Sequence, residues 1–305
     1  MVTRHKRGKI TWVDLESPTH AELDSVMKEF GIDPRVQDEI ISPTHYPLVI
    51  SYPKYEYLIL HFPTADPATG TRNQEIDFII GKQFLITARY EVIETIHSLH
   101  RVFEAEDMLG LSKPGAHAGH LLERIMKRMY SAIREEMERA SRLLEHIEDD
   151  MFSGKERHTV RSISDIGRVL LRFETALSRM NVVAHVVLKR LATPSFFGAT
   201  FVSHIAHIEG ERSHVVELVS SYRAAATELR ATNDSLLSAS QNEIMKMLTF
   251  LAFLASPLTI VASLFGMNVD KTPLSNSPHQ FWAIVSIGFL LSACMYLYFR
   301  FRKWI

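Results

Sequence analysis

The chain has 305 residues and a formal net charge of −1, from 34 basic and 35 acidic side chains. This balance gives no overall attraction for nucleic acid or for an anionic surface, and the single cysteine excludes an internal disulfide. The charge is unevenly distributed, because residues 1–246 are rich in charge and the remainder is largely apolar. The basic N-terminus is not followed by the apolar run of a signal peptide, so we expect the N-terminal part to remain in the cytoplasm.

Residues 1–115 are expected to form a cytoplasmic α/β domain. Short apolar segments bounded by Gly, Pro and Ser predict strands at 9–15, 48–52, 55–62, 75–81 and 84–89. Apolar spacing predicts helices at 20–30, 34–41 and 91–109. Asp33 is expected to cap the second helix, with Pro34 at its first position. No Gly-rich phosphate loop, Ser/His/Asp order or Cys-x-x-Cys pair is present, so we expect no enzymatic activity.

Residues 116–241 are expected to form a stalk, or funnel, of long helices. Heptad-like apolar spacing predicts a helix over 121–151, which Gly154 interrupts, and a second helix over 160–191. A third helix begins near Ser203 and meets no proline for roughly 50 residues, so it is expected to continue into the apolar region, over about 90 Å. A helix of that length needs neighbouring helices or other subunits to stabilise it.

Residues 242–305 are expected to form a transmembrane domain. Two runs of 19 residues without a charge, 247–265 and 281–299, would each be about 28 Å long as a helix, close to the hydrocarbon thickness of a bilayer. Neither run shows the polar face of a surface helix, which argues against the alternative of a buried hairpin in a soluble protein. The predicted fold class is therefore an α+β domain, long helices and a two-helix transmembrane hairpin.

Flanking residues predict the orientation of these two runs. Lys246 precedes the first run, and basic residues follow the second, so both chain termini are expected on the cytoplasmic side. The connector 266–280 is then the outer loop. Aromatic residues typical of the membrane interface lie near the ends of the second run and of the chain: Trp282, Tyr296, Tyr298 and Trp304.

One face of the first run has small and polar side chains at steps of three or four residues. These residues are Asn242, Met245, Thr249, Ala252, Ser256, Thr259 and Ser263. The alternative to a pore lining is a packing seam, because Ser, Thr and Ala let membrane helices approach closely. The two interpretations are compatible in a symmetric ring of helices. Neither run contains Asp, Glu, His, Lys or Arg, so a pore would offer hydroxyl and amide oxygens to a partly hydrated ion, without a carboxylate cage or a proton relay.

An ordered set of short motifs surrounds the two runs. Asn-Glu-Ile-Met-Lys at 242–246 opens the first run, Pro-Leu-Thr at 257–259 lies in its middle, and Gly-Met-Asn at 266–268 follows it. The chain ends in Arg-Lys-Trp-Ile. Over residues 222–305 this set resembles the CorA family of magnesium and cobalt transporters, and the soluble part fits the family more loosely through its order of elements.

The resemblance implies a homopentamer. Five copies of the first transmembrane helix would surround a central pore, with the second helix as an outer ring and the long helices as a cytoplasmic funnel. Gly266, Met267 and Asn268 would lie at the outer mouth, where the family's asparagine ring contacts the hydrated ion. Met245 and Leu248 match the positions of an apolar constriction, and such rings can gate by dewetting.

Two features depart from the family pattern. Many members have an acidic residue in the outer loop, but here Asp270 is followed by Lys271, so the attraction for cations is expected to be weaker. The regulatory aspartate that some members have on the long helix falls on Ala231. Asp234, one turn nearer the membrane, is a candidate replacement, with a solvated surface aspartate as the alternative.

Histidines on the third long helix raise zinc as an alternative substrate. His204, His207, Glu211 and His214 fall on one face at spacings of three, four and three residues, and side chains of these types can hold zinc. A solvated helix face is the favoured explanation of this pattern. The zinc-handling ZntB branch of the superfamily is the alternative family, although the intact Gly-Met-Asn favours magnesium.

The sequence therefore predicts a passive divalent-cation channel of the inner membrane. Magnesium is the first expected substrate, with cobalt or nickel as further cargo and zinc as the alternative. The expected partners are further copies of the chain, the lipid bilayer and the metal ions, with no resident cofactor and no nucleic acid. A membrane-anchored sensor or scaffold is the rival from another class, and it would require a catalytic or docking module that the sequence does not show.

Overall fold

The computed structural model describes residues 1–65, 72–111, 117–267 and 279–302. These fall into two compact units, Met1–Arg230 and Ala231–Ile305, which are taken separately below. The sheet and the long helices belong to the same unit, because one apolar cluster continues from the strands to the helices packed on them. The boundary expected near residue 115 therefore lies inside the first unit.

The first unit contains a six-stranded mixed sheet. Its strand order is β1-β2-β6-β5-β4-β3. Only the β2–β6 pair is parallel among the paired strands that the structure describes. The strands are β1 (Val2–Arg7), β2 (Ile10–Glu16), β3 (Leu48–Ser51), β4 (Tyr55–Thr64), β5 (Arg72–Gly81) and β6 (Phe84–Arg89).

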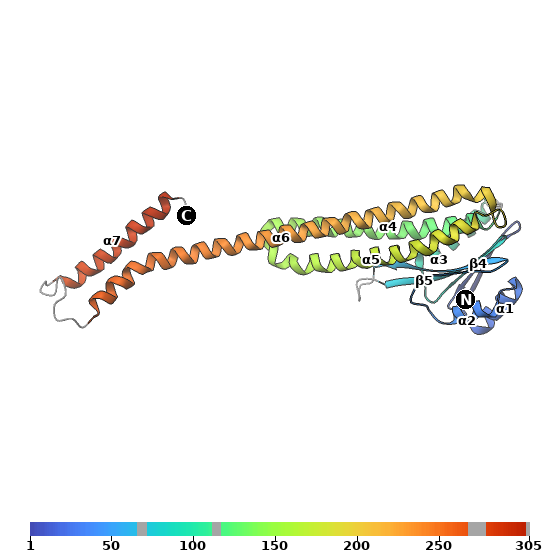
Figure 1. Cartoon of the computed structure of the whole chain (residues 1–305), viewed down its shortest axis with the longest axis horizontal. Helices are drawn as coiled ribbons and strands as arrows, with labels where there is room; N and C mark the ends of the chain where they lie inside the picture. Colours follow the sequence, from blue (N-terminus) through green and yellow to red (C-terminus); the bar gives the residue numbers. More distant parts are fainter. Residues whose placement is uncertain (66–71, 112–116, 268–278, 303–305) are drawn as a thin grey trace. The chain divides into compact units, whose positions relative to one another are not determined.

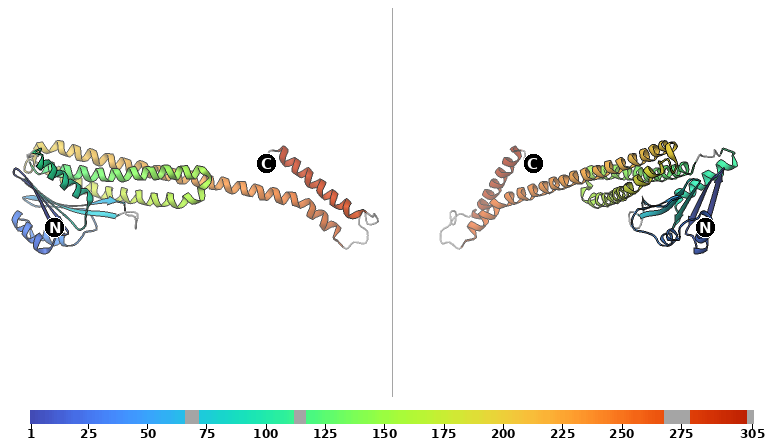
Figure 2. Two further views of the ribbon diagram at one scale, coloured as in Figure 1. Left: turned by 180° about the vertical axis from the view of Figure 1, so that it is seen from behind. Right: turned by 45° about the vertical axis from the view of Figure 1, so that its right-hand side comes forward.

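Helices cover both faces of this sheet (Figures 1 and 2). Side chains alternate along β4, so Tyr57 and Ile59 pack against α1 and α2, whereas Leu58 and Leu60 face the cluster that includes α3 and the long helices. This two-sided burial accounts for the nearly continuous apolar character of the central strands. The helices on the two faces are α1 (His20–Phe30) and α2 (Pro34–Ile41), then α3 (Glu94–Met108), α4 (Gly119–Asp150) and α5 (Glu156–Leu191).

The ends of the short helices follow the capping rules. Thr19 and Glu22 form a capping box at the start of α1, and Gly31, with a φ of 65°, ends that helix in the left-handed conformation that glycine adopts without strain. Asp33 accepts a hydrogen bond from the backbone of Arg35, so the predicted cap of α2 is confirmed. Gly154 interrupts the helical path between α4 and α5 with a φ of 83°, as its position predicts.

The strand β1 was not predicted from the sequence, because its run of basic residues resembles an exposed tail. In the structure it pairs with β2, and Arg7 is buried, with 7% of its surface exposed. The guanidinium of Arg7 donates to Glu106 and Asp107 at 2.8 and 3.0 Å and to the backbone oxygen of Phe103. A charge is tolerated there because acceptors nearly 100 residues away in sequence pair with it.

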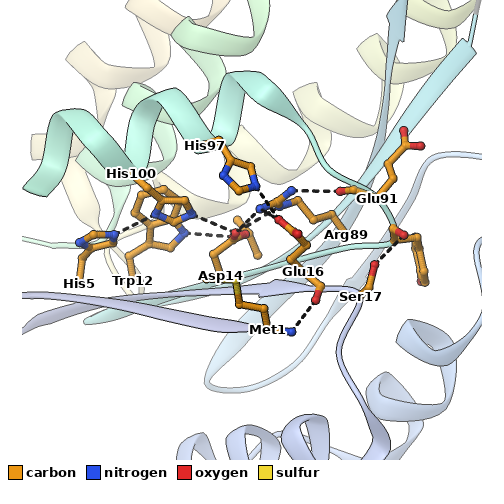
Figure 3. Close-up of polar contacts among 12 residues, drawn as sticks. Met1, His5, Trp12, Asp14, Glu16, Ser17, Arg89, Glu91, His97 and His100 are labelled. Atoms are coloured by element: carbon orange, nitrogen blue, oxygen red, sulfur yellow. Dashed lines mark hydrogen bonds and ion pairs between the residues drawn. The ribbon is translucent and has the colours of Figure 1, made fainter.

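A buried polar network fastens α3 to the sheet (Figure 3). Asp14 of β2 accepts hydrogen bonds from Thr87 at 2.6 Å, from Arg89 at 3.0 Å and from His100 Nε2 at 2.9 Å. On its other side, Nδ1 of His100 lies 2.9 Å from Nε2 of His5, so the two imidazole rings share a hydrogen bond. Each of these side chains is at least nine-tenths buried, so the network depends on every member being paired.

Burial and hydrogen bonding shift the titration of this network in consistent directions. Burial opposes ionisation of Asp14, but the hydrogen bond from His100 and the charge of Arg89 outweigh it and hold the pKa of Asp14 below its usual value. Burial, followed by the proximity of His100, lowers the pKa of His5. The folded state therefore favours an ionised Asp14 beside a neutral His5.

Candidate functional site

The second unit contains the C-terminal part of α6 (Val202–Phe265) and the helix α7 (Gln280–Phe301). Figure 1 shows α7 running back beside α6. Both helices are long and apolar enough to cross a membrane, and their apolar windows are only 6% and 11% buried. Exposure of this extent contradicts the alternative of a hairpin buried in the core of a single soluble chain.

One face of α7 contacts one face of α6 between Gly288 and Phe299. Gly288 lies against Leu258, and the hydroxyl of Ser292 donates to the backbone oxygen of Leu254 at 3.0 Å. Further along, the rings of Tyr296 and Phe299 lie 6.3 and 5.9 Å from that of Phe250. The contact face of α6 is therefore apolar apart from one backbone carbonyl.

The predicted polar residues of α6 lie on the opposite face. A helix turns about 100° per residue, so Ser256 points about 200° away from Leu254. The same count places all seven residues of the predicted set within about 60° of the direction opposite α7. Thr249 and Ser256 are half-buried and the other five are exposed. This face is therefore available to water, ions or other copies of the chain.

Three hydroxyls on this face donate hydrogen bonds to their own helix. Those of Thr249, Thr259 and Ser263 donate to the backbone oxygens of the residues four positions earlier, at 2.7, 3.2 and 2.7 Å. A hydroxyl has one proton and two lone pairs, so each of these oxygens presents lone pairs away from the helix backbone. The face consequently offers acceptors, which suit a cation or the water around it.

The ends of the predicted pore are only partly described. Asn242, Met245 and Leu248 are exposed on α6, and Gly266 ends that helix with a hydrogen bond from its nitrogen to Ala262 oxygen at 2.9 Å. Met267 is exposed as well. Asn268, Asp270 and Lys271, predicted at or near the outer mouth, lie outside the described residues.

The histidine face of α6 is paired with α4 in the first unit. Nδ1 of His204 and Nδ1 of His207 lie 2.5 and 2.7 Å from the two carboxylate oxygens of Glu123. Burial opposes ionisation of Glu123, but these two histidines outweigh it and lower the pKa of its carboxyl group. No sequence signal distinguishes Glu123, which is one of many charged residues on α4 and lies 81 residues from His204.

The remaining members of the predicted zinc group have different surroundings. Glu211 accepts from Arg134 of α4 at 2.9 Å, and His214 is exposed. Across the residues that the structure describes, no three His, Cys, Asp or Glu side chains are arranged to hold a metal ion. Within one chain, the contacts of these histidines therefore favour a structural role over metal binding. Asp234, the candidate regulatory residue, is exposed on α6.

Comparisons with known proteins agree with this architecture. The cobalt/magnesium transport protein CorA of Methanocaldococcus jannaschii is 23% identical over 300 residues, covering 97% of this chain and 92% of that protein. The complete structure of the CorA magnesium transporter from the same organism has a TM-score of 0.84 at 21% identity, covering 99% of this chain and 93% of that one. The ZntB cytoplasmic domain from Vibrio parahaemolyticus has a TM-score of 0.59 at 11% identity, over 75% and 88% of the two chains.

The family model described as CorA-like Mg²⁺ transporter protein matches residues 7–303. This match spans both units, and the fold similarity to CorA covers the α/β domain, the long helices and the two apolar helices together. The resemblance found in the C-terminal motifs is thereby confirmed over nearly the whole sequence, and the chain belongs to the CorA-like Mg²⁺ transporter family.

Proposed function

We propose that the protein is a magnesium channel in which the polar face of α6 lines the conduction path. The observation that carries the proposal is the position of that face, which is opposite the face covered by α7 and presents hydroxyl lone pairs outwards. Membership of a family of Mg²⁺ transporters supports the assignment of the cargo.

The chemistry of this face suits a hydrated ion. Magnesium prefers oxygen ligands and loses its water reluctantly, so weak neutral acceptors can hold its water shell without trapping the ion. The described parts of α6 and α7 within the membrane runs carry no carboxylate that would bind the ion directly. Conduction would therefore be passive permeation of a largely hydrated cation.

A single α6 cannot enclose an aqueous path, so the proposal includes assembly into a homopentamer. Five copies of the polar face would surround the axis, with α7 on the outside. Asn268 would contact the hydrated ion at the outer mouth, next to Gly266 and Met267, with Asp270 nearby. Met245 and Leu248 would form an apolar constriction at the other end.

The proposed location is the inner membrane, with both termini in the cytoplasm. Lys246 before the first apolar run, and Arg300 and Arg302 after the second, support this orientation. Cobalt is proposed as a further cargo, because the name of the Methanocaldococcus relative includes cobalt. Nickel stays a prediction from the sequence.

The proposal is tested by ion flux into proteoliposomes that contain the purified full-length chain. Entry of Mg²⁺ and of Zn²⁺ is followed with indicators inside the vesicles, on one preparation and against empty vesicles. We expect Mg²⁺ to enter down its gradient, with Zn²⁺ slower. Zn²⁺ entry without Mg²⁺ entry would assign the protein to the zinc alternative, and the absence of both would favour a sensor or scaffold.

A further inference from the structure

The helix α6 contains an interruption in its backbone hydrogen bonding within the apolar run. Pro257 has no N–H, so the carbonyl oxygen of Phe253 lacks its usual donor four residues later. The proline ring also crowds the carbonyl group of Phe253, and prolines are a common cause of helix bending. In hydrocarbon no water can replace these bonds, so the freed groups need donors from elsewhere in the protein.

The carbonyl group next to that of Phe253 receives a hydrogen bond from α7. The hydroxyl of Ser292 is directed at the backbone oxygen of Leu254, 3.0 Å away, and its side chain is 8% exposed. Leu254 belongs to the turn that Pro257 disturbs. This is a hydrogen bond between two apolar helices at the one place where the backbone of α6 is interrupted by proline.

A small residue lies one turn away from Ser292 on the same face of α7. A Cβ atom added to Gly288 would lie 2.9 Å from Leu258 Cδ2, so a larger residue would require the Leu258 side chain to move. Gly288 and Ser292 are separated by three residues, the spacing of small residues at which membrane helices approach closely. Together they place the Ser292 hydroxyl within reach of the α6 backbone.

The packing of the two helices beside this bond is incomplete. An apolar groove of about 470 Å³ between α6 and α7 borders Ser292 and is lined by residues that include Leu251, Ala255, Phe289 and Ala293. Dispersion contacts across such a groove are incomplete and non-directional. The hydrogen bond is therefore the directional contact that can hold α6 at one angle at Pro257.

We propose that Ser292 is a positioning residue for ion conduction, which limits bending of α6 at Pro257 through its hydrogen bond to Leu254. The polar face has members on both sides of the proline: Thr249 and Ala252 precede it, and Thr259 and Ser263 follow it. A change in the bend moves the second pair relative to the first. The link to conduction rests on the proposed function, whereas the effect on the bend does not.

A matched pair of substitutions separates the hydrogen bond from packing. Thr and Val have nearly the same size, so Ser292→Thr and Ser292→Val fill the same space, but only threonine retains the hydroxyl. The position of the polar face is monitored in the full-length protein with Cys294→Ala and one reporter cysteine. The reporter is introduced by Thr249→Cys, Thr259→Cys or Ser263→Cys. The rate of labelling by a charged, membrane-impermeant thiol reagent is measured, and native mass spectrometry checks assembly of each variant.

The expected result is specific to one side of the proline. Ser292→Val should change the labelling rates at 259 and 263 about fivefold relative to Ser292→Thr, the effect of one hydrogen bond, and leave the rate at 249 unchanged. Equal rates in the two variants, or an equal change at all three positions, would overturn the inference.

Flux measurements on Ser292→Val and Ser292→Thr without a reporter cysteine keep the two proposals distinguishable. If the wild-type chain transports Mg²⁺, Ser292→Val should alter the flux and Ser292→Thr should retain it. If the wild-type chain transports no divalent ion but the reporter cysteines are labelled, the proposed function fails while the labelling rates still decide the role of Ser292. Absence of labelling at all three positions would overturn the water-exposed face on which both proposals depend.

Discussion

At the scale of single residues, the chemistry of the candidate pore depends on where hydroxyl protons point. Thr249, Thr259 and Ser263 donate to their own helix, which leaves oxygen lone pairs as the outward groups. The spacing of these residues was visible in the sequence. The direction of their protons was not, because it depends on the backbone of the folded helix.

The outer mouth provides the first prediction at this scale. Asn268→Ala removes the amide that is proposed to contact the water shell of the ion, so Mg²⁺ flux should fall by about tenfold or more, the effect of losing one hydrogen bond to a charged group. Flux into proteoliposomes measures this effect. Asn276→Ala, in the same connector, is the matched control and should retain flux. Wild-type flux in Asn268→Ala would limit Gly-Met-Asn to a structural turn.

Asp234 provides a prediction about control from the cytoplasmic side. Five exposed aspartates around an axis repel one another, and a bound divalent ion would relieve that repulsion and favour one state of the channel. Asp234→Asn should therefore give flux that no longer falls as internal Mg²⁺ rises, with Glu228→Gln as an exposed acidic control. If inhibition by internal Mg²⁺ persists in Asp234→Asn, that residue is an ordinary surface aspartate.

At the scale of secondary-structure elements, the sequence was sufficient to predict the elements whose ends and faces depend on residues close together in the chain. Capping residues and periodicity located α1, α2 and the long helices, and the absence of charge located α7 and the apolar part of α6. The strand β1 was missed because the partners of buried Arg7 lie on α3, far away in sequence. Ser292 was missed because a lone serine in an apolar run gives no sign of its acceptor on another helix.

The network between β2, β6 and α3 leads to a prediction about pH. The pKa values of His5 and Asp14 are both lowered by folding, so the unfolded chain binds more protons as the pH falls. Stability of the first unit should decrease as the pH drops below 6.5, the ordinary value for histidine, and decrease again where Asp14 is protonated.

Substitution of His5 tests the upper part of this pH dependence. Thermal unfolding between pH 7.5 and pH 5 should show a shallower decline in Tm for His5→Asn than for the wild type. His45→Asn, an exposed histidine on the same unit, should keep the wild-type slope. An unchanged slope in His5→Asn would mean that another group titrates with folding in this range.

At the scale of the whole molecule, the family assignment came from an ordered set of C-terminal motifs and is confirmed over residues 7–303. The arrangement of copies could not follow from one chain, because the polar face of α6 has its proposed neighbours in other subunits.

Native mass spectrometry of the detergent-solubilised protein should show five copies. A stable monomer or dimer as the main species would contradict a pore formed by α6.

The central claim is that divalent ions pass along the polar face of α6, and a pair of matched variants tests it most directly. Thr259→Val preserves the shape of the side chain but removes an oxygen acceptor from that face, whereas Ser286→Ala removes a hydroxyl from the exposed surface of α7. Both are compared with the wild type in Mg²⁺ flux into proteoliposomes, at equal amounts of assembled protein. The account predicts that Thr259→Val lowers flux about tenfold and Ser286→Ala leaves it unchanged. Equal flux in the wild type and Thr259→Val, or a loss confined to Ser286→Ala, would contradict it.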